Sequence, residues 1–259
     1  MSSNFLDLSN SGLSIQIDLQ TGLLYFDNSI IPIKPEARML SNASEYYQLN
    51  RIMDTDRPLY YMYRDVRKKE DASTISLSPY RFDITVILPG MIGKEFYKTI
   101  GHVHPITPFC SIPYTYTEVY SVIYGTAHYI LQKYSEDLSK VIDIVDLVVN
   151  PFEHVLIPSF YGHVTVNSTD KPLVMANILY KDFVSNYEPY LKHRGAAIYL
   201  VKDGEKISQE FNTKYCNLPD PRNANAVNFQ APFLRFNESM YDQWIRNMNK
   251  FSYLYQSTE

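Results

Sequence analysis

The sequence predicts an all-β fold, a barrel or jelly roll built from short strands. Residues 81–201 form a succession of short strand-favouring runs separated by turn residues. Tyrosine, with 23 copies, outnumbers phenylalanine, with 13, while only 9 of the 259 residues are glycine. Aromatic and β-branched side chains suit the pleated, half-buried surface of a sheet. Composition and strand spacing therefore favour the same kind of fold.

Three parts of different character follow one another along the chain. Residues 1–80 are expected to form an N-terminal arm and connectors packed on the barrel. Within them, alternation over 13–19, a glycine-containing turn and an extended run over 23–26 predict a β-hairpin. Residues 81–201 are the expected barrel. Residues 202–259 are richer in Asn, Pro and Gln, which indicates a C-terminal extension over the surface. We expect one structural domain overall.

The end of the extension predicts a helix. Ser239 can cap its N-terminus, because a serine hydroxyl accepts a hydrogen bond from a backbone N–H of the first turn. Large apolar residues follow at helical spacing on one face: Met240, Trp244, Met248, Phe251 and Tyr255. We expect this face to pack on the chain's own barrel, with a contact to a partner subunit as the alternative.

Charge and cysteine content exclude several classes of protein. A formal net charge of −4 and a pI near 5.9 provide no basic surface for nucleic acid or an anionic membrane. Cys110 and Cys216 are too few for a disulfide framework. The first residues do not resemble a signal peptide, and there is no run of eighteen apolar residues. We expect a cytoplasmic protein with no nucleic-acid or membrane partner.

Four residues of the barrel region have the spacing of a metal site. His102 and His104 are separated by one residue, so in a strand both imidazoles point to the same face. Glu118 begins the next strong strand, and His163 can arrive from another strand across the barrel. Imidazole and carboxylate donors without a thiolate suit Fe(II), Mn(II), Ni(II), Zn(II) or Co(II), and a six-coordinate ion keeps two positions open. The sequence therefore predicts one divalent metal ion per subunit.

The same residues resemble the two motifs of the cupin family. They match the pattern at His102, His104, Glu118 and Gly125 of the first motif and at Pro158, His163 and Asn167 of the second. The resemblance implies a cupin barrel, also called a double-stranded β-helix or jelly roll.

This chain departs from the cupin pattern in two places. Thirteen residues separate His104 from Glu118, where cupins often have three or four, and Phe152 and Phe160 replace the usual glycines of the second motif. We expect the insertion, residues 105–117, to form a loop at the mouth of the barrel.

Residues that flank the ligands are more specifically similar to the archaeal-type glucose-6-phosphate isomerases within the cupins. The similarity covers about 82–199, and its matching segments are 85–90, 93–105, 118–120, 161–167 and 172–177. The resemblance implies a metal-dependent aldose-ketose isomerase that interconverts glucose 6-phosphate and fructose 6-phosphate in glycolysis and gluconeogenesis. It implies no organic cofactor.

The resemblance also implies roles for single residues. The metal ligands would be His102, His104, Glu118 and His163. Thr85, Thr99 and Gly101 would help to hold the sugar phosphate, and Tyr120 would lie near the sugar hydroxyls, with Tyr63 and Tyr187 as further candidates. Without the metal motif beside them, these Thr and Tyr residues would indicate ordinary sheet packing.

Two chemical routes stay open for the implied reaction. Glu118 or a metal-bound hydroxide could remove the C2 proton, or a hydride could shift directly between the two carbons. A spare imidazole, His154, is a candidate to orient a ligand or to serve as an alternative ligand.

Two other functions and one assembly are also compatible with the sequence. A non-catalytic metal cupin could bind a sugar or sugar phosphate. A cupin dioxygenase would use the same ligands beside an aromatic or sulfur substrate pocket. Because exchanged N-terminal strands can cover sheet edges, the 13–26 hairpin suggests a homodimer.

Overall fold

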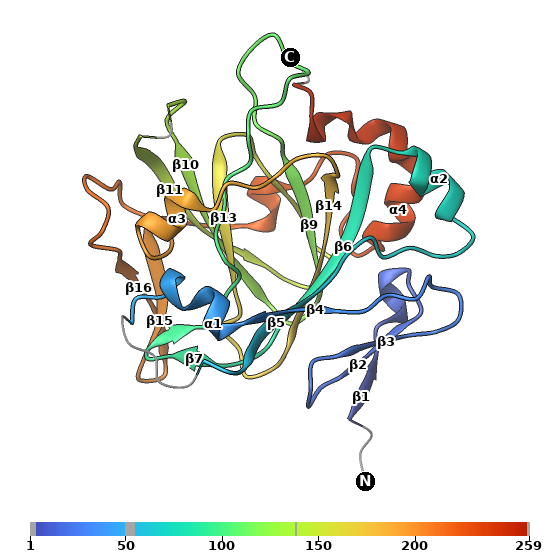
Figure 1. Cartoon of the computed structure of the whole chain (residues 1–259), viewed down its shortest axis with the longest axis horizontal. Helices are drawn as coiled ribbons and strands as arrows, with labels where there is room; N and C mark the ends of the chain where they lie inside the picture. Colours follow the sequence, from blue (N-terminus) through green and yellow to red (C-terminus); the bar gives the residue numbers. More distant parts are fainter. Residues whose placement is uncertain (1–3, 50–54, 138, 258–259) are drawn as a thin grey trace.

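Two large sheets form the centre of the fold (Figure 1). The computed structural model describes residues 4–49, 55–137 and 139–257, so parts of the predicted arm and extension (1–3, 50–54, 258–259) lie outside the described residues. The larger sheet has the order β12-β9-β14-β6-β5-β4, with β12 His154–Ile157, β9 Glu118–Tyr124, β14 Leu173–Tyr180, β6 Tyr80–Ile87, β5 Pro58–Tyr63 and β4 Glu36–Met39. The smaller sheet has the order β13-β10-β11-β17, with β13 Tyr161–Val166, β10 Ala127–Tyr134, β11 Val141–Val149 and β17 Arg222–Asn225.

Successive strands cross between these two sheets. Strand β9 lies in the larger sheet, β10 and β11 in the smaller, β12 in the larger and β13 in the smaller; β14 then returns to pair with both β6 and β9. Antiparallel strands that alternate between two layers in this way make a jelly roll. The predicted all-β, cupin-type barrel is confirmed.

Both faces of the central strands of the larger sheet are buried, which explains why most of their residues are apolar. On β9, Val122 packs between the two sheets with Tyr129 and Leu147 of the smaller one. Val119, on the opposite face of the same strand, packs in the cluster that contains Trp244. Since neighbouring residues of a strand point to opposite faces, a strand covered on both sides needs apolar residues at nearly every position.

The second face of the larger sheet is covered by the two ends of the chain. The predicted hairpin is present as β2 (Ile15–Asp18) and β3 (Leu24–Phe26), and β1 (Phe5–Asp7) extends it to a three-stranded sheet. Helix α4 (Met240–Asn247) lies beside it, against β6 (Figure 1). The hairpin arm and the terminal helix are thus confirmed, and both pack on the chain's own barrel.

The terminal helix begins as predicted but ends earlier than its apolar spacing indicated. The hydroxyl of Ser239 accepts a hydrogen bond from the backbone N–H of Asp242 at 3.0 Å, which makes it the N-cap. At Asn247 the backbone leaves helical geometry (φ −131°), and the chain continues as a 3-10 helix, η4 (Met248–Leu254). The Asn247 side chain donates to the carbonyl of Gln243, a bond that competes with regular helix continuation. Trp244 and Phe251 are nevertheless both buried, as the stripe predicted.

A fourth sheet and several short helices complete the described residues. This sheet has the order β16-β15-β8-β7, with β16 Lys206–Phe211, β15 Ile198–Asp203, β8 Glu95–Phe96 and β7 Met91–Ile92. The short helices are α1 Leu40–Ala43, α2 Ala72–Leu77, α3 Glu188–Lys192, η1 Ser9–Ser11, η2 Ser44–Tyr46 and η3 Ala226–Phe229. Across these described ranges, every helix is too short or too polar to pass through a bilayer.

Two turns near the barrel are built from phenylalanines in a left-handed conformation. Phe152 has φ 62° and Phe160 has φ 64°, and these are the positions where the second cupin motif usually has glycine. Left-handed backbone costs a residue with a Cβ roughly 1–2 kcal/mol, and glycine is largely spared that cost. Both phenylalanines therefore hold a backbone conformation that glycine would adopt at lower cost.

Candidate metal centre

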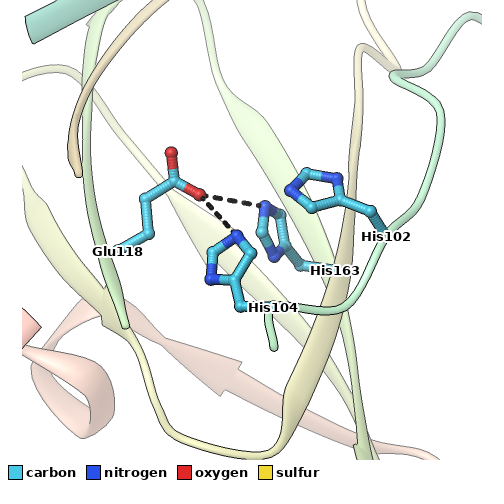
Figure 2. Close-up of side chains that lie close together, drawn as sticks. All are labelled: His102, His104, Glu118 and His163. Carbon is cyan, nitrogen blue, oxygen red and sulfur yellow. Dashed lines mark ion pairs between the residues drawn. The ribbon is translucent and has the colours of Figure 1, made fainter. Parts of the chain in front are cut away.

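The four predicted ligands converge between the two sheets (Figure 2). Nε2 of His104 and Nε2 of His163 lie 3.4 and 3.5 Å from Oε2 of Glu118. The ring of His102 has its centre 4.4 Å from that of His163 and 5.1 Å from that of His104. One donor atom of each residue lies within 4.8 Å of the other three. Bonds of about 2.1 Å to one ion place neighbouring ligands about 3–4 Å apart, so the four residues fit a single metal ion.

Backbone pairing fixes the positions of three of these side chains. His102 and His163 form an isolated antiparallel bridge, in which the N–H of His163 donates to the carbonyl of His102 at 3.1 Å. Glu118 is the first residue of β9, paired with Leu179 on one side and Ile157 on the other. Predicted ligands from three separate segments are thereby held in place by backbone pairing within the barrel.

Burial lowers the pKa of two of the imidazoles, His102 and His163, and so favours the neutral form that binds a metal. Burial, followed by the neighbouring His104, lowers the pKa of His102 to about 4. Burial also lowers the pKa of His163 well below its usual value. Nε2 of His104 is buried and has no hydrogen-bond partner among the described residues. A buried acceptor without a partner is costly, and an ion between Glu118 and His104 would satisfy it.

Hydrogen bonds from neighbouring residues orient the carboxylate and one imidazole. Nδ2 of Asn177 donates to Oε1 of Glu118 at 2.6 Å, which leaves Oε2 facing the two imidazoles. The hydroxyl of Tyr120 lies 3.1 Å from Nε2 of His163, so it stands beside the position that an ion would take. Asn177 was not predicted as a site residue, although a polar residue inside the apolar run of β14 was a usable signal.

The insertion at 105–117 contributes directly to the site. The carbonyl of Tyr116 accepts a hydrogen bond from Nδ1 of His104 at 3.0 Å. The insertion is itself held by the end of the chain, beside which it lies in Figure 1. Thr117 donates through N to the carbonyl of Leu254 at 3.0 Å and through Oγ1 to that of Tyr253 at 2.9 Å. Thr107 Oγ1 donates to the carbonyl of Tyr255 at 2.8 Å. The C-terminal segment thus fixes the loop that orients a ligand.

A cavity of about 420 Å³ opens onto the cluster. Of the predicted substrate residues, Thr85, Thr99, Tyr120 and Tyr187 line it. Its size lies within the usual range of small-molecule sites. The structure therefore brings these four residues together with three of the predicted ligands, His102, His104 and Glu118, which also line the cavity.

Two predicted substrate residues lie outside the cavity lining. Tyr63 is on the opposite face of β5, where its hydroxyl accepts a hydrogen bond from the N–H of Leu24 at 2.8 Å. Strand alternation places Tyr60 in the cavity instead. Gly101 lies behind the wall, where the ring of Tyr190 occupies the space that a side chain would need.

Three arginines that were not predicted as site residues also line the cavity: Arg38, Arg64 and Arg81. Asp83 pairs with Arg64 at 3.0 Å and with Arg81 at 2.8 Å. Nε of Arg38 is buried without a hydrogen-bond partner among the described residues. An anionic group in this cavity would therefore meet positive charge that the sequence motifs did not indicate.

Other titratable residues lie away from the cluster. Lys98, which follows a strand phase different from that of Thr99, is buried in an ion pair with Glu95. His154 faces the C-terminal extension, where its Nε2 donates to the carbonyl of Glu238 at 2.9 Å. His128 pairs with Asp146 at 2.8 Å. None of these three side chains belongs to the group of donor atoms found among the described residues.

Comparison with known proteins gives a consistent assignment. A family profile described as "Glucose-6-phosphate isomerase (GPI)" matches residues 36–217. A protein named glucose-6-phosphate isomerase from Thermococcus onnurineus is 26% identical over 208 residues, which cover 78% of this chain and 96% of that protein. The protein of the same name from Pyrococcus furiosus is 25% identical over 195 residues, covering 74% and 90%.

Among solved structures, oxalate decarboxylase from Lactobacillus farciminis in a formate complex is similar at a TM-score of 0.35 and 15% identity, covering 65% of this chain and 36% of that one. A similarity this low does not bear on function. The assignment rests on the family profile, which spans most of the chain. This protein belongs to the glucose-6-phosphate isomerase family.

Proposed function

We propose that this protein is a metal-dependent aldose-ketose isomerase that interconverts glucose 6-phosphate and fructose 6-phosphate in glycolysis and gluconeogenesis. One observation carries the proposal: three imidazoles and a carboxylate converge beside a small cavity whose lining includes three arginines. The metal ligands we assign are His102, His104, Glu118 and His163. Family membership supplies the substrate pair.

The reaction moves a hydrogen between C1 and C2 while a carbonyl and a hydroxyl exchange places. A divalent ion, when bound, would polarise these oxygens and stabilise the negative charge that develops on them. In the proton-transfer route, the Glu118 carboxylate takes the proton from C2 and returns it to C1 when its Oε2 is not bound to an ion, and the hydroxyl proton passes from O2 to O1. Asn177 holds Oε1 throughout. The Tyr120 hydroxyl, which lies 3.1 Å from His163, is placed to hydrogen-bond a sugar oxygen.

The phosphate group is assigned to the part of the cavity lined by Arg38, Thr85 and Thr99. Arg38 and Tyr60 are paired in register on β4 and β5, and Thr85 lies on the adjacent strand β6. A guanidinium and hydroxyl groups form charge-assisted and neutral hydrogen bonds to phosphate oxygens. An anchored phosphate would leave the C1–C2 end of the sugar free to reach Glu118.

A coupled assay tests the isomerase activity. Purified protein is stripped with a chelator, loaded separately with Fe, Mn, Ni or Zn, and supplied with fructose 6-phosphate. We expect glucose 6-phosphate to form with at least one metal. Absence of turnover with all four, with tight binding of the sugar phosphate retained, would instead favour a non-catalytic binding protein.

The two chemical routes are separated by isotope. Proton transfer through Glu118 would incorporate solvent deuterium into the product at C1 or C2, whereas a direct hydride shift would incorporate none.

We also propose that the protein acts as a cytoplasmic homodimer. The three-stranded N-terminal sheet, with Phe5 and Tyr25 exposed, offers an edge for a second copy. A monomeric mass in solution at micromolar concentration would contradict the dimer.

A further inference from the structure

A second cavity, of about 780 Å³, lies outside the barrel and away from the metal cluster. One wall is helix α3, through Glu188, Pro189 and Lys192. The rest of the lining comes from Tyr134, residues 139–142 and the segment 214–217. This cavity shares no lining residue with the cavity over the metal cluster. The proposed isomerase chemistry does not use it.

The charges around the outer cavity favour an anion. Lys140, Lys192 and Lys214 line it, while Glu188 is the one acidic residue among its lining residues. Nδ1 of His193 donates to the carbonyl of Pro189 at 2.7 Å, so the second nitrogen of this ring stays available. Three cations around one concave surface raise the local concentration of small anions.

The uncharged lining favours a ligand with a planar or apolar body. The rings of His193 and Tyr215 are stacked, with centres 3.9 Å apart and planes at 17°, and both line the cavity. Val141 and Ile142 add apolar surface, and Ile142 is 52% exposed. Small-molecule sites commonly combine such aromatic and aliphatic lining with a few charged groups.

Helix α3 connects this outer cavity to the metal cluster. Asn186, which lines the outer cavity, pairs with Val103, the residue between His102 and His104. The N–H of Val103 donates to the carbonyl of Asn186 at 3.0 Å, and the N–H of Asn186 donates to the carbonyl of Val103 at 2.9 Å. The next residue, Tyr187, lines the metal cavity, and its ring centre lies 5.4 Å from that of His102.

The ring of Tyr190, on the same helix, packs where two predicted ligands begin. Tyr190 is fully buried. A Cβ added to Gly101 would overlap its ring, and one added to Gly162 would lie 2.6 Å from its hydroxyl oxygen. These glycines directly precede His102 and His163. A displacement of α3 toward these glycines would therefore push on the two segments that carry His102 and His163, because close-packed groups transmit it.

We propose that the outer cavity binds a small organic anion with a planar body, the chemistry represented by a nucleoside monophosphate, and that its occupancy changes the metal affinity of the cluster through α3. The lysines would hold the anionic group, and the His193–Tyr215 stack would hold the planar body. The binding step does not depend on the proposed isomerase activity. The coupling step rests on the proposed metal site and is measured separately.

Calorimetric titration of the full chain with AMP tests the binding step. We expect saturable binding that the double substitution K192E/K214E weakens by about tenfold or more, because two attractive charges become repulsive. K202E is the matched control, since Lys202 is exposed and does not line this cavity; it should change the affinity less than about twofold. Adenosine and inorganic phosphate, which each lack one half of the ligand, should both bind more weakly than AMP. No AMP binding, or equal binding to the double variant, overturns the proposal.

A chelator-competition measurement of the metal dissociation constant tests the coupling. We expect saturating AMP to shift this constant by about fivefold in the unsubstituted protein, and much less in K192E/K214E. Any chelation of the metal by AMP itself affects both proteins equally, so the difference isolates the outer cavity. Equal shifts in the two proteins would refute coupling through α3 while leaving the binding result in place.

Discussion

The backbone carbonyl of Tyr116 accepts a hydrogen bond from Nδ1 of His104 at 3.0 Å. Since Nδ1 carries the proton, Nε2 is unprotonated, and it is this nitrogen that faces Glu118. Tyr116 belongs to the 105–117 insertion, the segment in which this chain departs from the common cupin spacing. The insertion is therefore part of the site's construction and also a neighbour of the C-terminal segment.

Weakening the hold on the insertion should weaken metal binding. Thr117→Val removes the hydroxyl that donates to the carbonyl of Tyr253 at 2.9 Å and keeps the shape of the side chain. A lost buried hydrogen bond costs about 1 kcal/mol, so we expect the metal dissociation constant to rise about three- to tenfold. Thr126→Val, in the turn at the other end of β9, is the control and should leave the metal dissociation constant unchanged. Unchanged metal affinity in T117V would mean that the loop holds His104 without this contact.

Loss of a single predicted ligand should abolish stoichiometric metal binding. Glu118→Ala and His163→Ala each remove a donor from a cluster whose donor atoms lie within 4.8 Å of one another. We expect metal content, measured by elemental analysis after dialysis, to fall from about one ion per chain to a small fraction. His128→Ala should keep its metal, because His128 pairs with Asp146 outside the cluster. Full metal content in both ligand variants would show that the ion binds elsewhere.

Arg38 should contribute to binding of the sugar phosphate more than to turnover. Replacing it with Leu removes a guanidinium from the cavity, so we expect KM for fructose 6-phosphate to rise about tenfold or more with a smaller change in kcat. Arg38→Lys should recover part of the loss. Arg222→Leu, which breaks a partly exposed pair with Asp143, should leave both constants unchanged. A fall in kcat alone for R38L would place Arg38 beside the reacting carbons instead.

At the left-handed turn of Phe152, substitution by glycine should leave the protein more stable than substitution by alanine, the reverse of the usual order of stability. Both substitutions remove the ring, but only glycine relieves the strain of φ 62°. We expect Phe152→Gly to be more stable than Phe152→Ala by about 1 kcal/mol in urea unfolding, although glycine is generally the less stable of the two in regular structure. Equal or greater stability of the alanine variant would contradict this account.

Acid should destabilise the protein partly through His154. Burial lowers the pKa of this group to about 4, against about 6.5 in an unfolded chain. Between about pH 4 and pH 6.5, His154 therefore binds a proton in the unfolded state but not in the folded state. The free energy of unfolding is unaffected by this group above about pH 6.5 and decreases as the pH falls toward 4. Comparing urea unfolding at pH 7 and pH 5, we expect His154→Gln to lose less stability than the unsubstituted protein. Equal losses would mean that His154 does not titrate in this range.

The features predicted correctly from sequence were those encoded by short spacings. His102 and His104 share a face because alternation in extended backbone is local. The cap at Ser239 and the buried Trp244 likewise depend on residues within a few positions of each other.

The missed features depend on how distant strands are aligned. Asn177 reaches Glu118 because β14 and β9 pair with Asn177 opposite Tyr120, and nothing local specifies that register. Tyr60, and not Tyr63, enters the cavity because Met62 pairs with Thr85. A shift of one residue would have exchanged the two faces of β5. The sequence therefore predicted the convergence of the four candidate ligands better than the residues that surround them.

The contacts that hold the insertion join residues 136 to 148 positions apart. Because a chain is synthesised from its N-terminus, all the segments that carry the predicted ligands leave the ribosome before residues 253–255 exist. Until then, nothing in the C-terminal segment can fix the loop that orients His104. Metal binding would consequently occur only near the end of synthesis or after it. A chain that ends before residue 253 would lack the contacts that fix the loop beside His104.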